Sequence, residues 1–413
     1  ADDATLCVLP KGEGESNALS FFGDGDFRFA GRATLTCATP DGTRATADGF
    51  YAVAQTGAVT SRMEFVEAAT FGPGQSPASF MHLGASAGHV QVLRLASDAV
   101  HCLPSQLIVG IGAGEGVLDI EAGTVRGGWY GLAIAGLYTA DASFALTPRG
   151  TMRMSGGTLR LATGLAGNPW PLGLVVGDGA FCRQKNADGT FAGGDFRGLV
   201  EMTGGAIVGE GANTACVLGV GFATGRIRQS GGTVTLKRTE KRCAAFVGLC
   251  GGTGEWALSG GAVDIAGFAY VGGVTTNEVG VYSASSPLDK FVSLIGERLG
   301  QARGTLRLTG GTFKVGKDLV LSGDGTGALE LGPDAALAVG GRLDARAGSK
   351  LVVDVRGYTG HSRTLATFAG GTATAFDEAN VALLQDRPSG YRLDVAPAHV
   401  RVVSCRGTAL IVR

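Results

Sequence analysis

Short runs of alternating apolar and polar residues, separated by glycine-rich turns, make up most of the chain. The clearest example is 217–265, where one pattern occurs twice. Each copy has apolar residues ending in Gly, then Gly-x-apolar, a Ser-Gly-Gly turn and a second alternating run. Val217 in the first copy corresponds to Phe246 in the second, 29 residues later. Alternation predicts strands, and a repeat of this length predicts a solenoid, in which each unit buries its apolar face against the next.

Two sequence elements recur beyond this pair. The first is a run of apolar residues ending in Gly, at 107–110, 174–177, 217–219, 246–248 and 270–272. The second centres on a small-Gly turn, at 118–125, 152–159, 200–207, 227–234, 256–263 and 306–313. We therefore predict an all-β chain that forms a right-handed parallel β-helix.

Aligning the second element gives two columns of equivalent residues. The position two residues after the second Gly is always apolar and predicts a core column: Val125, Leu159, Ile207, Val234, Val263 and Phe313. The position two residues before the Ser/Thr position is mostly charged: Asp119, Arg153, Glu201, Arg228, Ala257 and Arg307. Strand alternation places this second column on the outside, where stacking at ~4.8 Å brings unlike charges near one another.

Three regions follow from where the pattern is regular. Residues 1–105 have imperfect strand runs and are predicted to be a capping region, 106–355 form the solenoid, and 356–413 are closing strands. Two insertions interrupt the solenoid. Residues 181–197 are predicted to be a polar loop, and 286–300 a short amphipathic helix with Ser286 as its N-cap, Pro287 in its first turn and Gly300 at its end.

Composition narrows the class of protein. Gly accounts for 71 of 413 residues, more than double the usual ~7%. The net charge is −1, which argues against non-specific nucleic-acid binding. No apolar run approaches the ~18 residues of a membrane span.

Two features favour an exported protein. Ala1 is interpreted as the residue left after signal-peptide cleavage. The even number of cysteines is compatible with four disulfides, although the sequence does not give their connectivity. Local pairs such as Cys7–Cys37 and Cys243–Cys250 are plausible, as is a contact between Cys7 and Cys405 of neighbouring subunits. The eight cysteines are Cys7, Cys37, Cys102, Cys182, Cys216, Cys243, Cys250 and Cys405.

The phrase apolar-Val-Gly followed by Gly-x-apolar-x-apolar-Ser-Gly-Gly-Thr-apolar resembles the strand repeats of autotransporter-passenger-like surface proteins. The resemblance covers about residues 107–355. It implies a secreted, right-handed parallel β-solenoid with an extracellular or cell-surface role. Neither a C-terminal membrane barrel nor an anchoring tail is evident, so the resemblance does not indicate how the protein would be attached.

Several groups of polar residues are candidates for chemistry, and each also has a structural explanation. The column Asp119, Glu201, Arg153, Arg228 and Arg307 suits a saccharide-cleaving wall or a ladder of surface ion pairs, and its repetition favours the ladder. The loop residues Asp178, Asp188, Asp195, Arg183 and Arg197 suit a carbohydrate site, but their sequence context favours turns. Metal-ligand spacing is absent from the histidines His82, His89, His101, His361 and His399. The run 251–255 lacks the Asp of a calcium repeat. We therefore predict no catalytic residues, no cofactor and no metal.

The leading functional hypothesis is a non-enzymatic secreted structural protein. It would be a surface-layer component or a filament subunit that assembles head-to-tail with itself. An alternative is an adhesin that binds glycans or a host surface through loops such as 181–197. A polysaccharide lyase or hydrolase is the third hypothesis.

Overall fold

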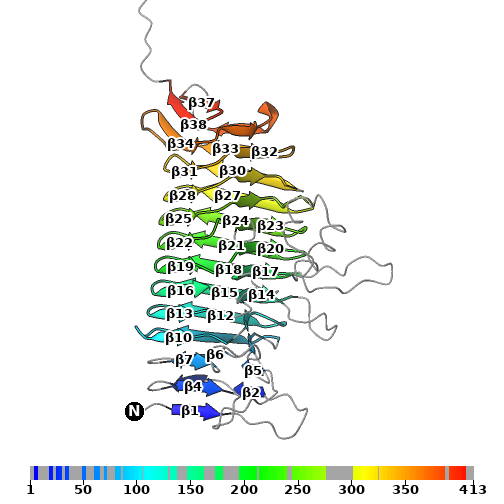
Figure 1. Cartoon of the computed structure of the whole chain (residues 1–413), viewed down its shortest axis with the longest axis vertical. Coiled ribbons are helices and arrows are strands. Elements are labelled where there is room, and N and C mark those ends of the chain that lie inside the picture. The colour runs from blue at the N-terminus through cyan, green and yellow to red at the C-terminus, as the bar shows by residue number, and fades with distance from the viewer. Residues whose placement is uncertain are drawn as a thin grey trace, which may run out of the picture.

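The computed structural model is an elongated stack of coils, each of which contributes strands to three long sheets (Figure 1). It describes residues 80–405 except 85–86, 105, 129–130, 137–146, 162–172, 180–194, 212–213, 240–243, 276–300, 324 and 387–389. Before residue 80 it describes only seven strands. The predicted helix at 286–300 and most of the predicted loop at 181–197 therefore lie outside the described residues.

Successive strands enter the three sheets in turn. Sheet A has 14 strands: β1 (Ala4–Cys7), β4 (Ala33–Thr36), β7 (Ala69–Phe71), β10 (Val100–Cys102), β13 (Thr124–Arg126), β16 (Thr158–Leu161), β19 (Ala206–Gly209), β22 (Thr233–Leu236), β25 (Ala262–Ile265), β28 (Thr312–Val315), β31 (Ala336–Val339), β34 (Arg363–Phe368), β38 (His399–Ser404) and β37 (Tyr391–Ala396). Sheet B has 12: β2 (Ala18–Phe21), β5 (Gly49–Ala52), β8 (Phe80–Leu83), β11 (Gln106–Val109), β14 (Leu132–Gly136), β17 (Leu174–Asp178), β20 (Cys216–Val220), β23 (Ala245–Leu249), β26 (Ala269–Val271), β29 (Leu319–Leu321), β32 (Leu343–Ala345) and β35 (Thr372–Thr374). Sheet C also has 12: β3 (Gly25–Phe29), β6 (Thr60–Phe65), β9 (Val90–Leu95), β12 (Glu115–Ile120), β15 (Arg149–Met154), β18 (Arg197–Met202), β21 (Thr224–Gln229), β24 (Thr253–Leu258), β27 (Arg303–Leu308), β30 (Thr326–Leu331), β33 (Lys350–Asp354) and β36 (Val381–Leu384).

Up to β36, each strand pairs in parallel with the strand three places along the chain, which confirms the predicted parallel β-solenoid. The strands β1 to β10 of the predicted capping region extend the same three sheets. The C-terminal end differs, because β38 pairs antiparallel with both β34 and β37. These strands lie within residues 356–413, and a 3₁₀ helix, η2 (Glu378–Asn380), precedes β36. The boundary at residue 105 stays a prediction.

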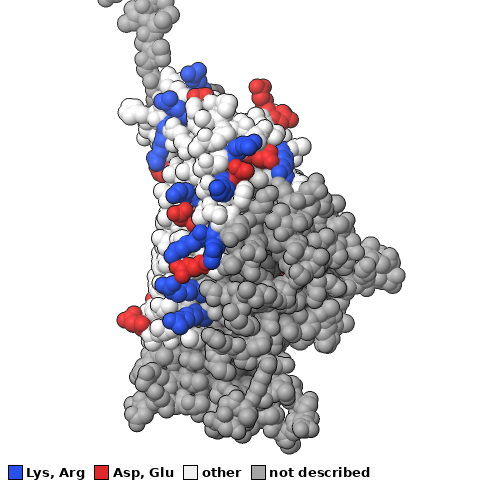
Figure 2. Space-filling model, viewed as in Figure 1, with Lys and Arg blue, Asp and Glu red and all other residues white. Residues whose placement is uncertain are grey.

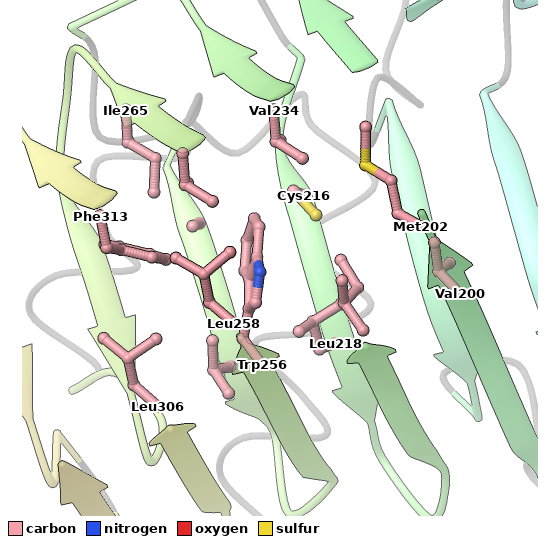
Figure 3. Close-up of a cluster of buried hydrophobic side chains, with 14 of the residues drawn as sticks. Val200, Met202, Cys216, Leu218, Val234, Trp256, Leu258, Ile265, Leu306 and Phe313 are labelled. Atoms are coloured by element: carbon pink, nitrogen blue, oxygen red, sulfur yellow. The ribbon is translucent and has the colours of Figure 1, made fainter. Parts of the chain in front are cut away.

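The predicted core column is buried and in register through sheet A. Val125 pairs with Leu159, and the column continues through Ile207, Val234, Val263 and Phe313. Each of these side chains is at most 1% exposed. From sheet C, Trp256 enters the same core and meets Phe313 edge-on, with ring centroids 5.4 Å apart (Figure 3). The core is therefore one continuous column of apolar side chains along the axis.

Glycine at one repeated position allows the backbones of sheets B and C to lie in direct contact. Seven consecutive sheet C strands have Gly as their second residue: Gly116, Gly150, Gly198, Gly225, Gly254, Gly304 and Gly327. A Cβ on Gly225 would lie 1.8 Å from the carbonyl oxygen of Val176, and one on Gly150 would lie 1.9 Å from that of Val109. Sheet C therefore begins where its backbone passes directly against the end of sheet B, and no side chain fits there.

The middle of sheet B is apolar on both faces. Besides the side chains that enter the core, a second column runs through Val175, Val217, Phe246, Tyr270 and Val320. These five side chains are buried, and the Phe246 and Tyr270 rings stack with centroids 5.3 Å apart. Strands buried on both faces have continuous apolar runs instead of alternation, which explains the first sequence element.

Acid is expected to destabilise the fold through His82, which precedes Ile108 in this second column. Burial lowers the pKa of His82 from 6.5 to about 4. The unfolded chain therefore binds a proton that the folded chain does not between these two values. Stability should fall by about 3 kcal/mol as the pH drops from 7 to 4. Urea unfolding at a series of pH values measures this loss.

The variant His82→Phe should lose this part of the pH dependence, because an apolar ring cannot take up the proton. His361→Phe makes the same substitution at an exposed histidine and serves as the comparison variant. An unchanged slope in His82→Phe would show that other groups cause the acid sensitivity.

Candidate functional site

The predicted charged column lies in register on the outer face of sheet C. Asp119, Arg153, Glu201, Arg228, Ala257 and Arg307 occupy equivalent positions on successive strands, as predicted. The column also extends in both directions, to Glu64 and Arg94 before Asp119 and to Glu330 after Arg307. The charges alternate in sign along it, except at Ala257. Figure 2 shows positive and negative side chains interleaved along the long axis on the face in view.

Ion pairs connect the members of this column. Arg94 contacts Glu64 at 2.9 Å and Glu121 at 2.8 Å. At the other end, Arg307 contacts Glu330 at 2.6 Å and Glu255 at 3.2 Å. The middle contacts are longer: Arg153 lies 3.7 Å from Asp119 and 3.8 Å from Glu201, which Arg228 also approaches at 3.8 Å.

The protonation equilibria of the column differ with local burial. The Arg94 hydrogen bond lowers the pKa of Glu121. Burial raises the pKa of Asp119, although Arg153 acts in the opposite direction. Asp119 and Glu201 are the two carboxylates of the column that the sequence offered for acid–base chemistry. Both contact the guanidinium of Arg153. This arrangement suits an ion-pair ladder.

Two hollows interrupt this face. The first, called here the arginine groove, has a volume of about 470 Å³ and crosses β15, β18 and β21. Its charged lining residues are Glu115, Arg149, Asp195, Arg197, Arg226 and Arg228. The second hollow has a volume of about 760 Å³ and lies near the C-terminal end, between Arg307, Pro333, Arg356 and Leu384.

The predicted loop site is not brought together as one cluster in the described residues. Asp178 is buried at the end of β17 in sheet B, beside Gly136 and Val220. Asp195 and Arg197 are exposed at the start of β18 in sheet C, where Arg197 donates to the Asp195 carboxylate at 2.7 Å. Asp188 and Arg183 lie outside the described residues.

The histidines occupy unrelated places. His82, His89 and His101 are buried, His399 lies 3.1 Å from Asp394, and His361 is exposed. Within the described part of the chain, no group of His, Cys, Asp and Glu has the arrangement of a metal site. Glu255, at the end of the glycine-rich run 251–255, contacts Arg226 at 3.3 Å as well as Arg307.

The expectation of four disulfides does not hold, because Cys102, Cys216 and Cys405 are free thiols. Burial raises the pKa of Cys216 to about 12, so this cysteine acts as a small apolar residue of the core. Cys37, Cys182 and Cys243 lie outside the described residues, and with them the proposed pairs Cys7–Cys37 and Cys243–Cys250. An even cysteine count is weak evidence in a chain with a core this large.

The sequence did not predict the arginine groove. Arg149 and Arg197 are the first residues of their sheet C strands, each followed by the glycine at the second position. Their shared Arg-Gly sequence is the signal that could have revealed the groove.

Comparison with known proteins gives no relative: no protein-family model, no curated protein and no solved structure matches the chain. Among the described residues, no helix has the length and apolar character needed to cross a membrane. The autotransporter-like resemblance of the repeats therefore stays an expectation from the sequence.

Proposed function

We propose that the chain is a non-enzymatic structural rod, exported to form part of a surface layer or an extracellular filament through end-to-end contacts. The observation that carries this proposal is that, among the described strands, sheets B and C have unpaired edges. Their edge strands are β2 and β35 in sheet B, and β3 and β36 in sheet C. An edge strand offers unpaired backbone groups to another strand, and a head-to-tail contact of this kind propagates unless it closes on itself.

The C-terminal end favours sheet C for such a contact. Sheet A ends there in the antiparallel strands β38 and β37, whereas sheet C ends in β36, which pairs in parallel like the rest of its sheet. Leu384 in β36 is 38% exposed, one of three large apolar side chains with this much exposure among the described residues. A parallel strand added beside β36 would cover it.

The wall of the rod supports a structural role as well. The ion pairs along sheet C join each coil to its neighbours over most of the length of the stack. Each exposed pair contributes only about 0–1 kcal/mol, but a ladder of alternating sign also fixes the register of successive coils. The carboxylates of this column therefore serve in ion pairs between coils.

The variant Leu384→Lys tests the proposed contact, because a lysine at a sheet edge opposes the addition of another strand. We expect the native chain to form larger species as its concentration rises, and Leu384→Lys to remain monomeric in analytical ultracentrifugation and negative-stain microscopy. Val100→Lys is the matched control, since Val100 is 45% exposed but lies in β10, within the stack. A native chain that stays monomeric at every concentration would contradict the assembly.

A second candidate function is an adhesin that holds a glycan on the wall of the rod. The arginine groove favours this candidate, because its lining carries more positive than negative side chains. Localisation outside the cell is common to both candidates and can be tested by fractionating the producing cells.

A further inference from the structure

We propose that the arginine groove binds an acidic polysaccharide, through uronate carboxylates or sulfate groups spaced along the sugar chain. This binding site goes beyond the structural role and does not depend on assembly of the rod.

Two guanidinium groups in the groove, those of Arg149 and Arg228, make no close carboxylate contact among the described residues. Arg149 approaches Asp195 at 3.9 Å and Arg228 approaches Glu201 at 3.8 Å, both too long for a hydrogen bond. No hydrogen bond to either guanidinium is found in the described part of the protein. Their side chains are 55% and 61% exposed. Each can therefore offer a pair of donors to an incoming anion.

The available carboxylates do not neutralise the groove. The Asp195 carboxylate is shared between two arginines, because it accepts a 2.7 Å hydrogen bond from Arg197 and also lies near Arg149. Glu201 is likewise shared between Arg153 and Arg228. By contrast, the Arg94 guanidinium elsewhere on this face is hydrogen-bonded to both Glu64 and Glu121. The groove thus differs from the ladder around it.

The shape of the groove suits a sugar chain. Its lining also includes the uncharged side chains of Thr151, Leu199 and Thr224, and its volume of about 470 Å³ lies in the range of small-ligand sites. The two threonine hydroxyls can exchange hydrogen bonds with sugar hydroxyls.

The spacing of the arginines suits a repeated anion. Arg149 and Arg197 are register partners on neighbouring strands, so their Cα atoms are ~4.8 Å apart across the sheet. Arg226 and Arg228 are two residues apart along β21, which gives ~6.6 Å and places both on the same face. A polymer with a negative group on successive sugars can meet several of these arginines together.

Nucleic acid fits the groove less well than an acidic sugar chain does. Single strands bind through aromatic side chains on which the bases stack, and the lining residues include no aromatic ring.

Binding of defined polymers to the full chain tests the proposal. Polygalacturonate represents uronates, dextran sulfate represents sulfated sugars, unmodified dextran is the neutral control and polyuridylate represents nucleic acid. We expect the native chain to bind one or both acidic polysaccharides and not dextran. Arg149→Gln/Arg228→Gln should weaken that binding at least about tenfold in biolayer interferometry, because charged hydrogen bonds are lost.

Arg160→Gln/Lys314→Gln is the matched control. It makes the same change in net charge on exposed side chains of sheet A and should leave binding unchanged. Arg149→Lys/Arg228→Lys keeps the charge but removes the paired donors, so it should also weaken binding even if the glutamine variant folds poorly.

Three results would overturn the proposal: no binding of either acidic polysaccharide, equal losses in the groove and control variants, or polyuridylate bound as tightly through the same arginines. Leu384→Lys should keep the binding, so failure of the groove and failure of the assembly are distinguishable.

Discussion

Gly225→Ala is expected to cost about 4 kcal/mol or more of folding free energy, or to prevent folding altogether. The new methyl group would lie 1.8 Å from the carbonyl oxygen of Val176 and 2.4 Å from the backbone nitrogen of Gly219. Both are backbone atoms: Val176 belongs to the preceding coil, and Gly219 lies near the end of β20, just before the turn that leads into β21. Relief therefore requires the two coils to separate and the turn to change. Chemical unfolding followed by circular dichroism measures the loss.

Gly136→Ala is the matched control for this substitution. A Cβ there meets the side chain of Asp178 at 3.2 Å and no backbone atom closer than that, so a small adjustment relieves the contact. We expect a change below about 1.5 kcal/mol. Equal stability of the two variants would show that the coils are not packed as closely at Gly225 as described.

Trp256→Ala should cost about 3–5 kcal/mol, the range for removing a large buried aromatic side chain. Trp256 is fully buried in the axial core and packs against Phe313 at an interplanar angle of 84°. Its loss would leave a cavity between the coils that contribute Leu258 and Leu306 (Figure 3). Calorimetry or urea unfolding gives the difference.

Trp256→Phe separates packing from hydrogen bonding at this position. The indole Nε1 of Trp256 is buried without a hydrogen-bond partner among the described residues. Phenylalanine removes that unsatisfied donor and keeps most of the ring, so its cost should be less than half that of alanine. A cost as large as that of alanine would mean that the indole is held by an interaction other than packing.

The repeats predicted the fold because alternation and the Gly-Gly turns recur in the same order in each coil. Val125 and Asp119 illustrate this: one was predicted inside and the other outside, and both lie in register columns as expected. A parallel stack converts position within a repeat directly into position in space. The charged column was therefore predictable residue by residue.

Features that depend on more than one repeat were not predicted. The outer column of sheet B contains Phe246 and Tyr270, but a run without alternation does not tell which residues face the core. The arginine groove depends on Arg149 and Arg197 being neighbours although 48 residues separate them. The free thiols of Cys102 and Cys216 depend on burial and distance, which a cysteine count does not contain.

The chain makes one full coil in the 29 residues between Val217 and its register partner Phe246. The three strands of this coil pair with the three strands of the next coil, each at equivalent positions of the repeat. An in-frame duplication or deletion of one coil would bring equivalent strand edges together. The core side chains of the coils on either side would keep the same kind of neighbours. The length of this chain is accordingly open to change by whole coils, in a way that a closed barrel or propeller does not allow.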